Sequence, residues 1–200
     1  CDRRQRQMCI RDRLWIVLGL VVVLVLMIFS AFIGTFNNLQ VMDESVTSNW
    51  AQVENQLKRR NDLIPNLVET VKGYAKHEST VFTNIADARS KLSGAMNSQD
   101  VNAVAKSTSE LNGALSRLLM IVERYPELKA DKQFIGLQDE LAGTENRIAV
   151  ARRDYNESVK ALNARIRTFP TNIVAMISGI KAREYFEVSE SEKAVPAVKF

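Results

Sequence analysis

The residues best suited to acid–base chemistry are the only histidine, His77, and the carboxylates Glu78 and Asp87. Imidazole and carboxylate groups exchange protons with substrates, so such a set could support hydrolysis. A zinc-protease helix needs a second histidine four residues after the first, where this chain has Val81. A di-iron bundle needs a glutamate three residues before its histidine, where this chain has Tyr74. We therefore predict a solvated helix face and no enzyme, with an unrecognised carboxylate site as the alternative.

Other residue patterns that support catalysis are missing from the sequence. It has no glycine-rich phosphate loop and no Gly-x-Ser-x-Gly nucleophile elbow. The only cysteines, Cys1 and Cys9, precede the part of the chain that can build a core. Cysteine nucleophiles, disulfides and metal clusters are therefore not expected in the folded part. We predict no catalytic residues, no cofactor and no metal.

Two groups of basic residues could in principle bind nucleic acid. Lys58, Arg59 and Arg60 are consecutive, and a second group is spread over a later predicted helix: Arg147, Arg152, Arg153, Arg165 and Arg167. Acidic residues interrupt the second group, and no aromatic stacking surface accompanies either, whereas nucleic-acid binding needs a basic face. We predict ion pairs of these basic residues with Asp62, Glu69 and Glu145, and no nucleic-acid partner.

The net charge of the chain is concentrated at its N-terminus. The 200 residues include 27 basic and 23 acidic ones, which gives a formal charge of +4. Five arginines, two aspartates and both cysteines fall in residues 1–13, so residues 14–200 hold 22 basic and 21 acidic side chains. Residues 8–13 resemble the translation of a sequencing adapter, which indicates that the 1–13 tail is partly not native. The basic balance is therefore no argument for an acidic partner.

The first structural element of the chain is a run of twenty uncharged residues, from Leu14 to Ile33. At about 1.5 Å per residue, a helix of this length crosses the roughly 30 Å hydrocarbon core of a membrane. A buried core helix is rarely apolar on all sides, and a cleaved signal peptide has a shorter apolar stretch. We therefore predict one retained transmembrane helix over 14–36, which would make the chain a single-pass membrane protein.

The distribution of charge about this span predicts its orientation. Five arginines precede it, no basic residue follows before Lys58, and Asp43 and Glu44 lie just beyond it. The positive-inside rule then places the N-terminus in the cytoplasm and the following domain outside it.

The next apolar residues recur in steps of three, four or seven, which is helical spacing. They are Val46, Trp50, Val53, Leu57, Ile64, Leu67, Val71, Tyr74, Val81, Ile85, Ala88 and Leu92. This stripe predicts one helix over about 43–96. Pro65 lies inside it, removes one backbone donor and should kink it. Two helices with a sharp break at Pro65 are the alternative.

Later segments predict further helices and no strand. The turn over 97–100 supplies capping residues for a helix that ends at Tyr125 and Pro126. Another helix is predicted over about 131–168, and Pro170 can open a short one over 171–180. We predict an all-α fold, in which the transmembrane helix precedes an antiparallel up-and-down bundle (37–180) with three long helices, a short C-terminal one and coiled-coil packing. A mostly irregular tail (181–200) follows.

Long ordered strings of the sequence closely resemble the LemA family. The first is Trp50–Ala75 (WAQVENQLKRRNDLIPNLVETVKGYA), and the others are Ala151–Val159 (ARRDYNESV), Phe169–Asn172 (FPTN) and Glu184–Phe186. With the N-terminal span, the resemblance covers about residues 14–190. It departs at Ala161 and Leu162, where relatives often carry an aromatic residue.

The resemblance implies an N-terminally anchored helical bundle of a bacterial cytoplasmic (inner) membrane, and it implies no catalytic activity or cofactor. Its signature residues of structural or unknown role are Arg59, Arg60, Asp62, Pro65, Asn66 and Gly73. We hypothesise that Asp62 or Asn66, with arginine partners, satisfies backbone groups that Pro65 frees. The predicted function is a protein-interaction or envelope-organising module whose partners are other, unidentified envelope proteins. A self-assembling membrane scaffold, which would be a homo-oligomer, is the alternative.

Overall fold

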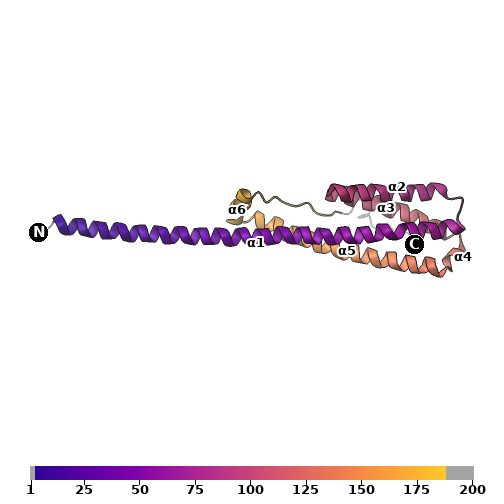
Figure 1. Ribbon diagram of the computed structural model, residues 1–200, viewed down its shortest axis with the longest axis horizontal. Coiled ribbons are helices and arrows are strands. Elements are labelled where there is room, and N and C mark those ends of the chain that lie inside the picture. Colours follow the sequence, from indigo (N-terminus) through magenta and orange to yellow (C-terminus); the bar gives the residue numbers. More distant parts are fainter. Residues whose placement is uncertain (1–2, 188–200) are drawn as a thin grey trace, which may run out of the picture. The chain divides into compact units, whose positions relative to one another are not determined.

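The computed structural model describes residues 3–187, with side chains from Trp15 onward. These residues form helices and no strand: α1 (Arg3–Tyr74), α2 (Ser79–Ser98), α3 (Val101–Val122), α4 (Pro126–Lys129), α5 (Lys132–Ile166) and α6 (Thr171–Ser178) (Figure 1). The all-α class that the apolar periodicity predicted is confirmed. The ends of both predicted tails, residues 1–2 and 188–200, lie outside the described residues.

The helix predicted over 43–96 is wrong, because α1 ends at Tyr74 and α2 begins at Ser79. The alternative break at Pro65 is also wrong, since α1 continues through this proline. The Ala75 N–H makes the last bond of α1, to the carbonyl of Val71 at 2.9 Å. The step of seven residues from Tyr74 to Val81 equals two helical turns, so a four-residue reversal leaves the apolar spacing unchanged.

The later boundaries agree closely with the sequence prediction. Asp100 caps α3, because its Oδ1 accepts the N–H of Asn102 at 2.9 Å and that of Ala103 at 3.1 Å. Such a cap satisfies donors that the first helical turn leaves free. Pro126 opens the short helix α4, which the sequence pattern did not reveal and whose Leu128 is fully buried.

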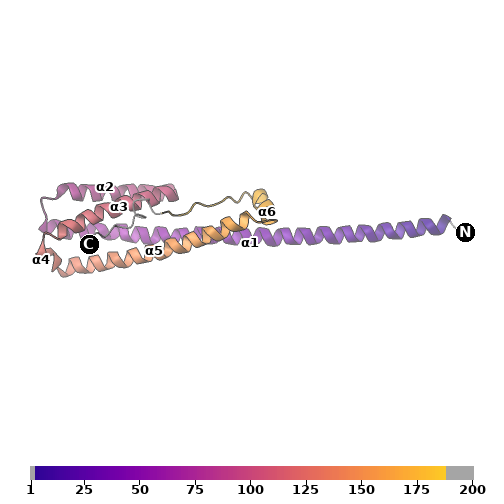
Figure 2. The ribbon, with the colours of Figure 1, turned by 180° about the vertical axis from the view of Figure 1, so that it is seen from behind.

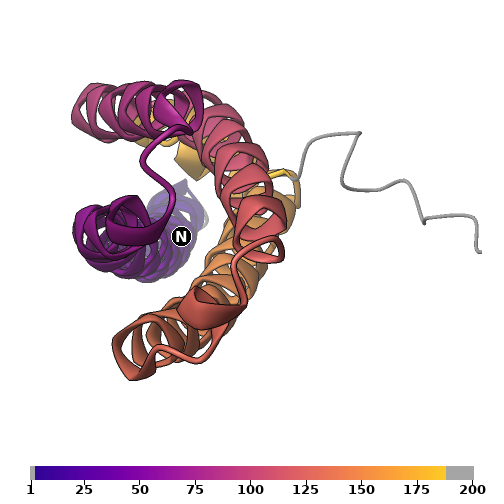
Figure 3. The same ribbon diagram turned by 90° about the vertical axis from the view of Figure 1, so that its right-hand side faces the viewer.

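The chain divides into two compact units. Of the described residues, one contains Ser45–Ala161 with Arg183–Glu187, and we call it the bundle unit. Figure 3 shows α2, α3 and α5 on an arc around α1 in this unit. Its fully buried side chains include Leu57, Ile64, Leu67, Ile85, Leu92, Leu111, Leu118, Leu128, Phe134 and Ile148. Burial of one such side chain stabilises the fold by roughly 1.5–3 kcal/mol, and this packing supports helices that would be marginal alone.

The other compact unit contains residues up to Glu44 with Leu162–Ala182, and we call it the anchor unit. Every side chain of α1 from Trp15 to Ala31 is exposed, so this segment is not the buried helix of a protein core. Burial begins at Phe32 and continues through Thr35 and Phe36 to Leu39, along one helix face. The views in Figures 1 and 2 both place α6 and the end of α5 beside α1.

Candidate functional site

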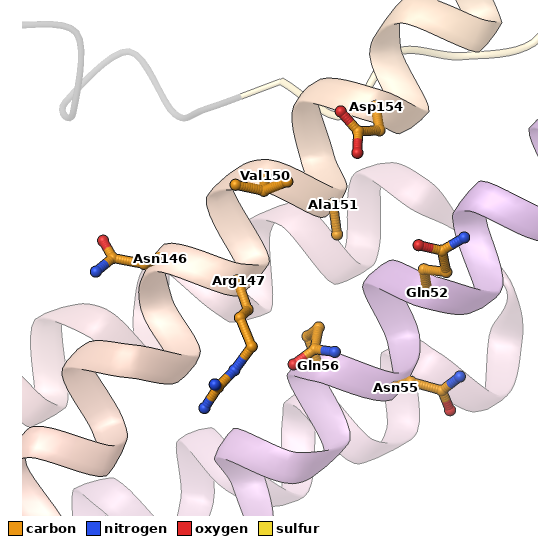
Figure 4. Close-up of a pocket in the computed structure, with 8 residues that line it drawn as sticks. All are labelled: Gln52, Asn55, Gln56, Asn146, Arg147, Val150, Ala151 and Asp154. Carbon is orange, nitrogen blue, oxygen red and sulfur yellow. The ribbon is translucent and has the colours of Figure 1, made fainter.

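A groove with a volume of about 390 Å³ lies between α1 and α5 in the bundle unit. Helical spacing places its side chains, because residues three or four positions apart share one face. The lining residues are Gln52, Asn55 and Gln56 of α1 and Asn146, Arg147, Val150, Ala151 and Asp154 of α5 (Figure 4). Since the two rows come from helices far apart in the sequence, the groove exists only when α1 and α5 pack together.

The chemistry of the groove is that of side-chain amides. Gln52, Asn55, Gln56 and Asn146 each carry donors and an acceptor, and the single arginine and aspartate leave the lining close to neutral. Gln56 Oε1 is buried and accepts no hydrogen bond from the described residues. A buried acceptor without a donor is costly. The amides of Gln52, Asn55 and Asn146 are exposed, so they can exchange hydrogen bonds with the backbone of a polypeptide in the groove.

Ion pairs at one end of the groove join α1 to α5. Arg59 Nη2 lies 2.5 Å from Glu140 Oε1, and the groove residue Arg147 contacts the same oxygen at 3.3 Å. Arg60, whose side chain is only 10% exposed, lies 2.6 Å from Glu145 Oε2. The predicted pairing of the basic triplet with Glu145 is therefore present, and Glu140 is a partner that the sequence pattern did not reveal.

An aromatic cluster flanks the other end of the groove. The ring of Trp50 lies 5.2 Å from that of Tyr155 and 6.1 Å from that of Phe186. The Tyr155 hydroxyl donates to the Glu184 carbonyl at 2.8 Å, and burial raises its pKa. Arg152 lies over the Phe186 ring at 4.5 Å, a cation–π distance. These contacts hold the segment after α6 against α5.

Pro65 lies in the part of α1 that contacts α2, whereas the groove lies between α1 and α5. A residue in its place would donate its N–H to the carbonyl of Asn61, four positions earlier, and proline cannot. In the structure the Asn61 carbonyl accepts a hydrogen bond from Arg89 Nε of α2 at 3.1 Å. The Asn61 side chain accepts from the same nitrogen at 3.3 Å and donates to Ser93 at 3.1 Å. The acceptor that Pro65 frees thus joins α1 to α2.

The remaining signature residues point away from these contacts. Asp62 and Asn66 are exposed, and the arginine at the freed carbonyl is Arg89, which the sequence pattern did not reveal. Gly73 is exposed in the last turn of α1, and a methyl group in its place would meet no atom within 4 Å. The structure therefore separates the signature into arginines that face α5, the Pro65 region that faces α2, and exposed positions.

The residues considered for catalysis do not converge. Glu78 precedes α2 and pairs with Arg124 at 3.0 Å, and His77 beside it is exposed. Asp87 lies nine residues further along, a rise of about 13 Å on a helix, beyond the carboxylate spacing of acid–base pairs. Among the described side chains, no group of three or more His, Cys, Asp or Glu could hold a metal ion.

Comparison with known proteins adds an independent observation. A sequence model described as the LemA family matches residues 49–200. Magnetosome protein MamQ 2 of Paramagnetospirillum magneticum is 28% identical over 184 residues, which covers 78% of this chain and 68% of the relative. Magnetosome protein MamQ of Magnetospirillum gryphiswaldense is 27% identical over 183 residues (78% and 67%). Protein LemA of Metamycoplasma hominis is 26% identical over 165 residues, with 82% and 74% covered.

Proposed function

Because the chain belongs to the LemA family, we propose that it is a single-pass membrane protein whose bundle unit binds other envelope proteins through the groove between α1 and α5. The transmembrane anchor is supported by one observation: every side chain of α1 from Trp15 to Ala31 is exposed, and none of these residues is charged. Apolar surface of this extent is stable in lipid and unfavourable in water.

The layout of the protein follows from this anchor. The span occupies 14–36 in a bacterial inner membrane, and the helices that follow it extend to Ser178. The N-terminus is cytoplasmic and the bundle extracytoplasmic, since the 44 residues from Leu14 to Leu57 contain no basic side chain. An alkaline phosphatase fused to the C-terminus is expected to be active in cells. An inactive but stable fusion would refute this orientation.

The groove supports a binding role because the side-chain amides of Gln52, Asn55 and Asn146 are exposed. These amides favour a partner that exchanges hydrogen bonds with them through its backbone or side chains. The ion pairs of Arg59 and Arg60 with α5 fix the width of the groove at one end. A helical bundle with such a groove can hold an extended or helical segment of another protein.

Site-specific photocrosslinking in cells tests this role. A photoreactive residue replaces Asn55, which is exposed and lines the groove, and the control replaces Ser116, an exposed residue of α3. We expect Asn55 to capture one or a few envelope proteins that Ser116 does not capture. Identical adducts at both positions would refute the groove as the binding surface, and adducts made only with the chain itself would favour the self-assembling scaffold.

The same cells test the enzyme alternative. His77→Ala and Glu78→Ala variants are expected to retain full cellular function, because neither side chain belongs to the groove. Loss of function in either variant, with normal folding, would favour a carboxylate site instead.

A further inference from the structure

Helix α6 presents two apolar faces, and only one of them is covered. Val174 and Ala175 are buried within the anchor unit. On the opposite face Ile173, Met176 and Ile177 are exposed, and Phe169 just before the helix is exposed as well; the exposed fraction reaches 81% for Met176 and 80% for Phe169. Several exposed large apolar side chains on one short helix indicate a surface that contacts a membrane or another protein.

The charged residues near α6 in the sequence are all basic. Residues 162–182 contain Arg165, Arg167 and Lys181 and no acidic residue, and all three basic side chains are exposed. Asp43 and Glu44 are the acidic residues of the part of α1 after the span that belongs to this unit. An apolar helix face flanked in the sequence by basic residues is complementary to anionic phospholipid, whose headgroups attract Lys and Arg while its acyl chains accept the apolar side chains.

The position of α6 along α1 fits the surface of a membrane. The charge-free segment of α1 is long enough to span the hydrocarbon core and ends at Ile33. The face of α1 that becomes covered begins at Phe32 and reaches Leu39, and α6 lies beside α1 in both side views (Figures 1 and 2). α6 and this segment of α1 belong to the same compact unit, which is consistent with a position of α6 near the point where α1 leaves the bilayer.

We propose that α6, with Phe169, is a second membrane contact that inserts its exposed apolar face beside anionic phospholipid in the leaflet from which α1 emerges. The inference rests on the proposed transmembrane anchor and adds a site to it. Phe169 lies at the depth where aromatic side chains are enriched, and Arg165, Arg167 and Lys181 reach headgroup phosphates. The contact fixes the depth of the anchor unit at the membrane surface.

Depth-dependent quenching tests the proposal in the full-length chain. Cys1→Ser and Cys9→Ser variants remove the native thiols, and a single cysteine that carries an environment-sensitive fluorophore is introduced as Met176→Cys. Met120→Cys provides a matched control, since Met120 is also an exposed methionine but lies in the bundle unit. Leu24→Cys reports on the span. The proteins are reconstituted in phosphatidylcholine vesicles with or without phosphatidylglycerol, and the quencher is a nitroxide on the acyl chains.

In vesicles that contain phosphatidylglycerol, we expect the labels at positions 176 and 24 to lose most of their emission and the label at 120 to lose almost none. Quenching at 176 is expected to fall in pure phosphatidylcholine, and also when Arg165, Arg167 and Lys181 are all replaced by Gln. Quenching at position 24 is expected to stay unchanged in both cases. Circular dichroism of each variant confirms the helix content.

Several outcomes would overturn the inference. A label at 176 that stays as unquenched as the one at 120, while position 24 is quenched, refutes the lipid contact and leaves the anchor intact. An unquenched label at 24 refutes the anchor and this inference together. A label at 176 that is shielded from water in a concentration-dependent way, without quenching by lipid, shows that a second copy of the chain covers the face instead.

Discussion

The contact between Arg89 and the carbonyl that Pro65 frees gives the sharpest test of how the bundle is held together. The Asn61 carbonyl accepts from Arg89 because Pro65 has no N–H to donate to it. Removal of Arg89 should therefore lower the free energy of unfolding more when residue 65 is proline than when it is alanine. A double-mutant cycle with Pro65→Ala and Arg89→Met measures this difference, because it isolates the coupling of the two residues.

The magnitude follows from the hydrogen bonds that each variant breaks. In the natural chain Arg89→Met removes bonds to the Asn61 carbonyl at 3.1 Å and to its side chain at 3.3 Å. Hydrogen bonds to charged groups contribute about 1.5–3 kcal/mol, and the orphaned carbonyl adds to the loss, so we expect about 2–3 kcal/mol. In the Pro65→Ala background the helix supplies the missing donor, and Arg89→Met should then cost only about 1 kcal/mol.

Urea unfolding of the 34–200 fragment provides the assay. Trp50 is its only tryptophan and packs between Tyr155 and Phe186, so its fluorescence reports on the bundle. Arg117→Met is the control, since Arg117 is an exposed arginine of α3 and its loss should change stability by less than about 0.5 kcal/mol. The reasoning is refuted if Arg89→Met costs the same, within about 0.5 kcal/mol, in the natural chain and in the Pro65→Ala variant.

Four further predictions address the rest of the chain. The 34–200 fragment should fold as a soluble domain, and a mainly β or disordered far-ultraviolet circular dichroism spectrum would contradict this. Gly73→Ala should raise the free energy of unfolding by about 0.5–1 kcal/mol in the urea assay, because alanine favours the last turn of α1 and meets no neighbour. Arg60→Met should lower the free energy of unfolding by about 1–3 kcal/mol, because Glu145 loses its partner. The loss stays below that of a fully buried ion pair because Glu145 is partly exposed to solvent, and Lys58→Met should change the free energy of unfolding little. The N–H of Phe134 lowers the pKa of Asp131, so its stabilisation is present above the unfolded pKa of about 4 and disappears as pH falls through the lower folded value. Unfolding curves of Asp131→Asn and the natural chain should therefore converge in acid, and a constant difference down to low pH would exclude this origin.

Local patterns in the sequence were sufficient for the parts of the fold that depend on one helix at a time. The uncharged run predicted the apolar helix, and the stripe from Val46 to Leu92 predicted most of the side chains that α1 and α2 bury. The caps at Asp100 and the start of α6 after Pro170 were predictable for the same reason. The apolar pattern did not reveal the reversal at residues 75–78, because its length leaves the helical spacing of the apolar residues unchanged.

The membrane-length apolar helix, the all-α fold and the family signature around Pro65 can all be recognised from residues that are close together in the sequence. The pairing of Arg89 with the Asn61 carbonyl and the groove between α1 and α5 appear only once the helices are packed. Helix formation depends on neighbours within a few residues, whereas these pairings depend on the relative register of helices separated by tens of residues. The register is set by packing of the whole core, and no single stripe contains that information.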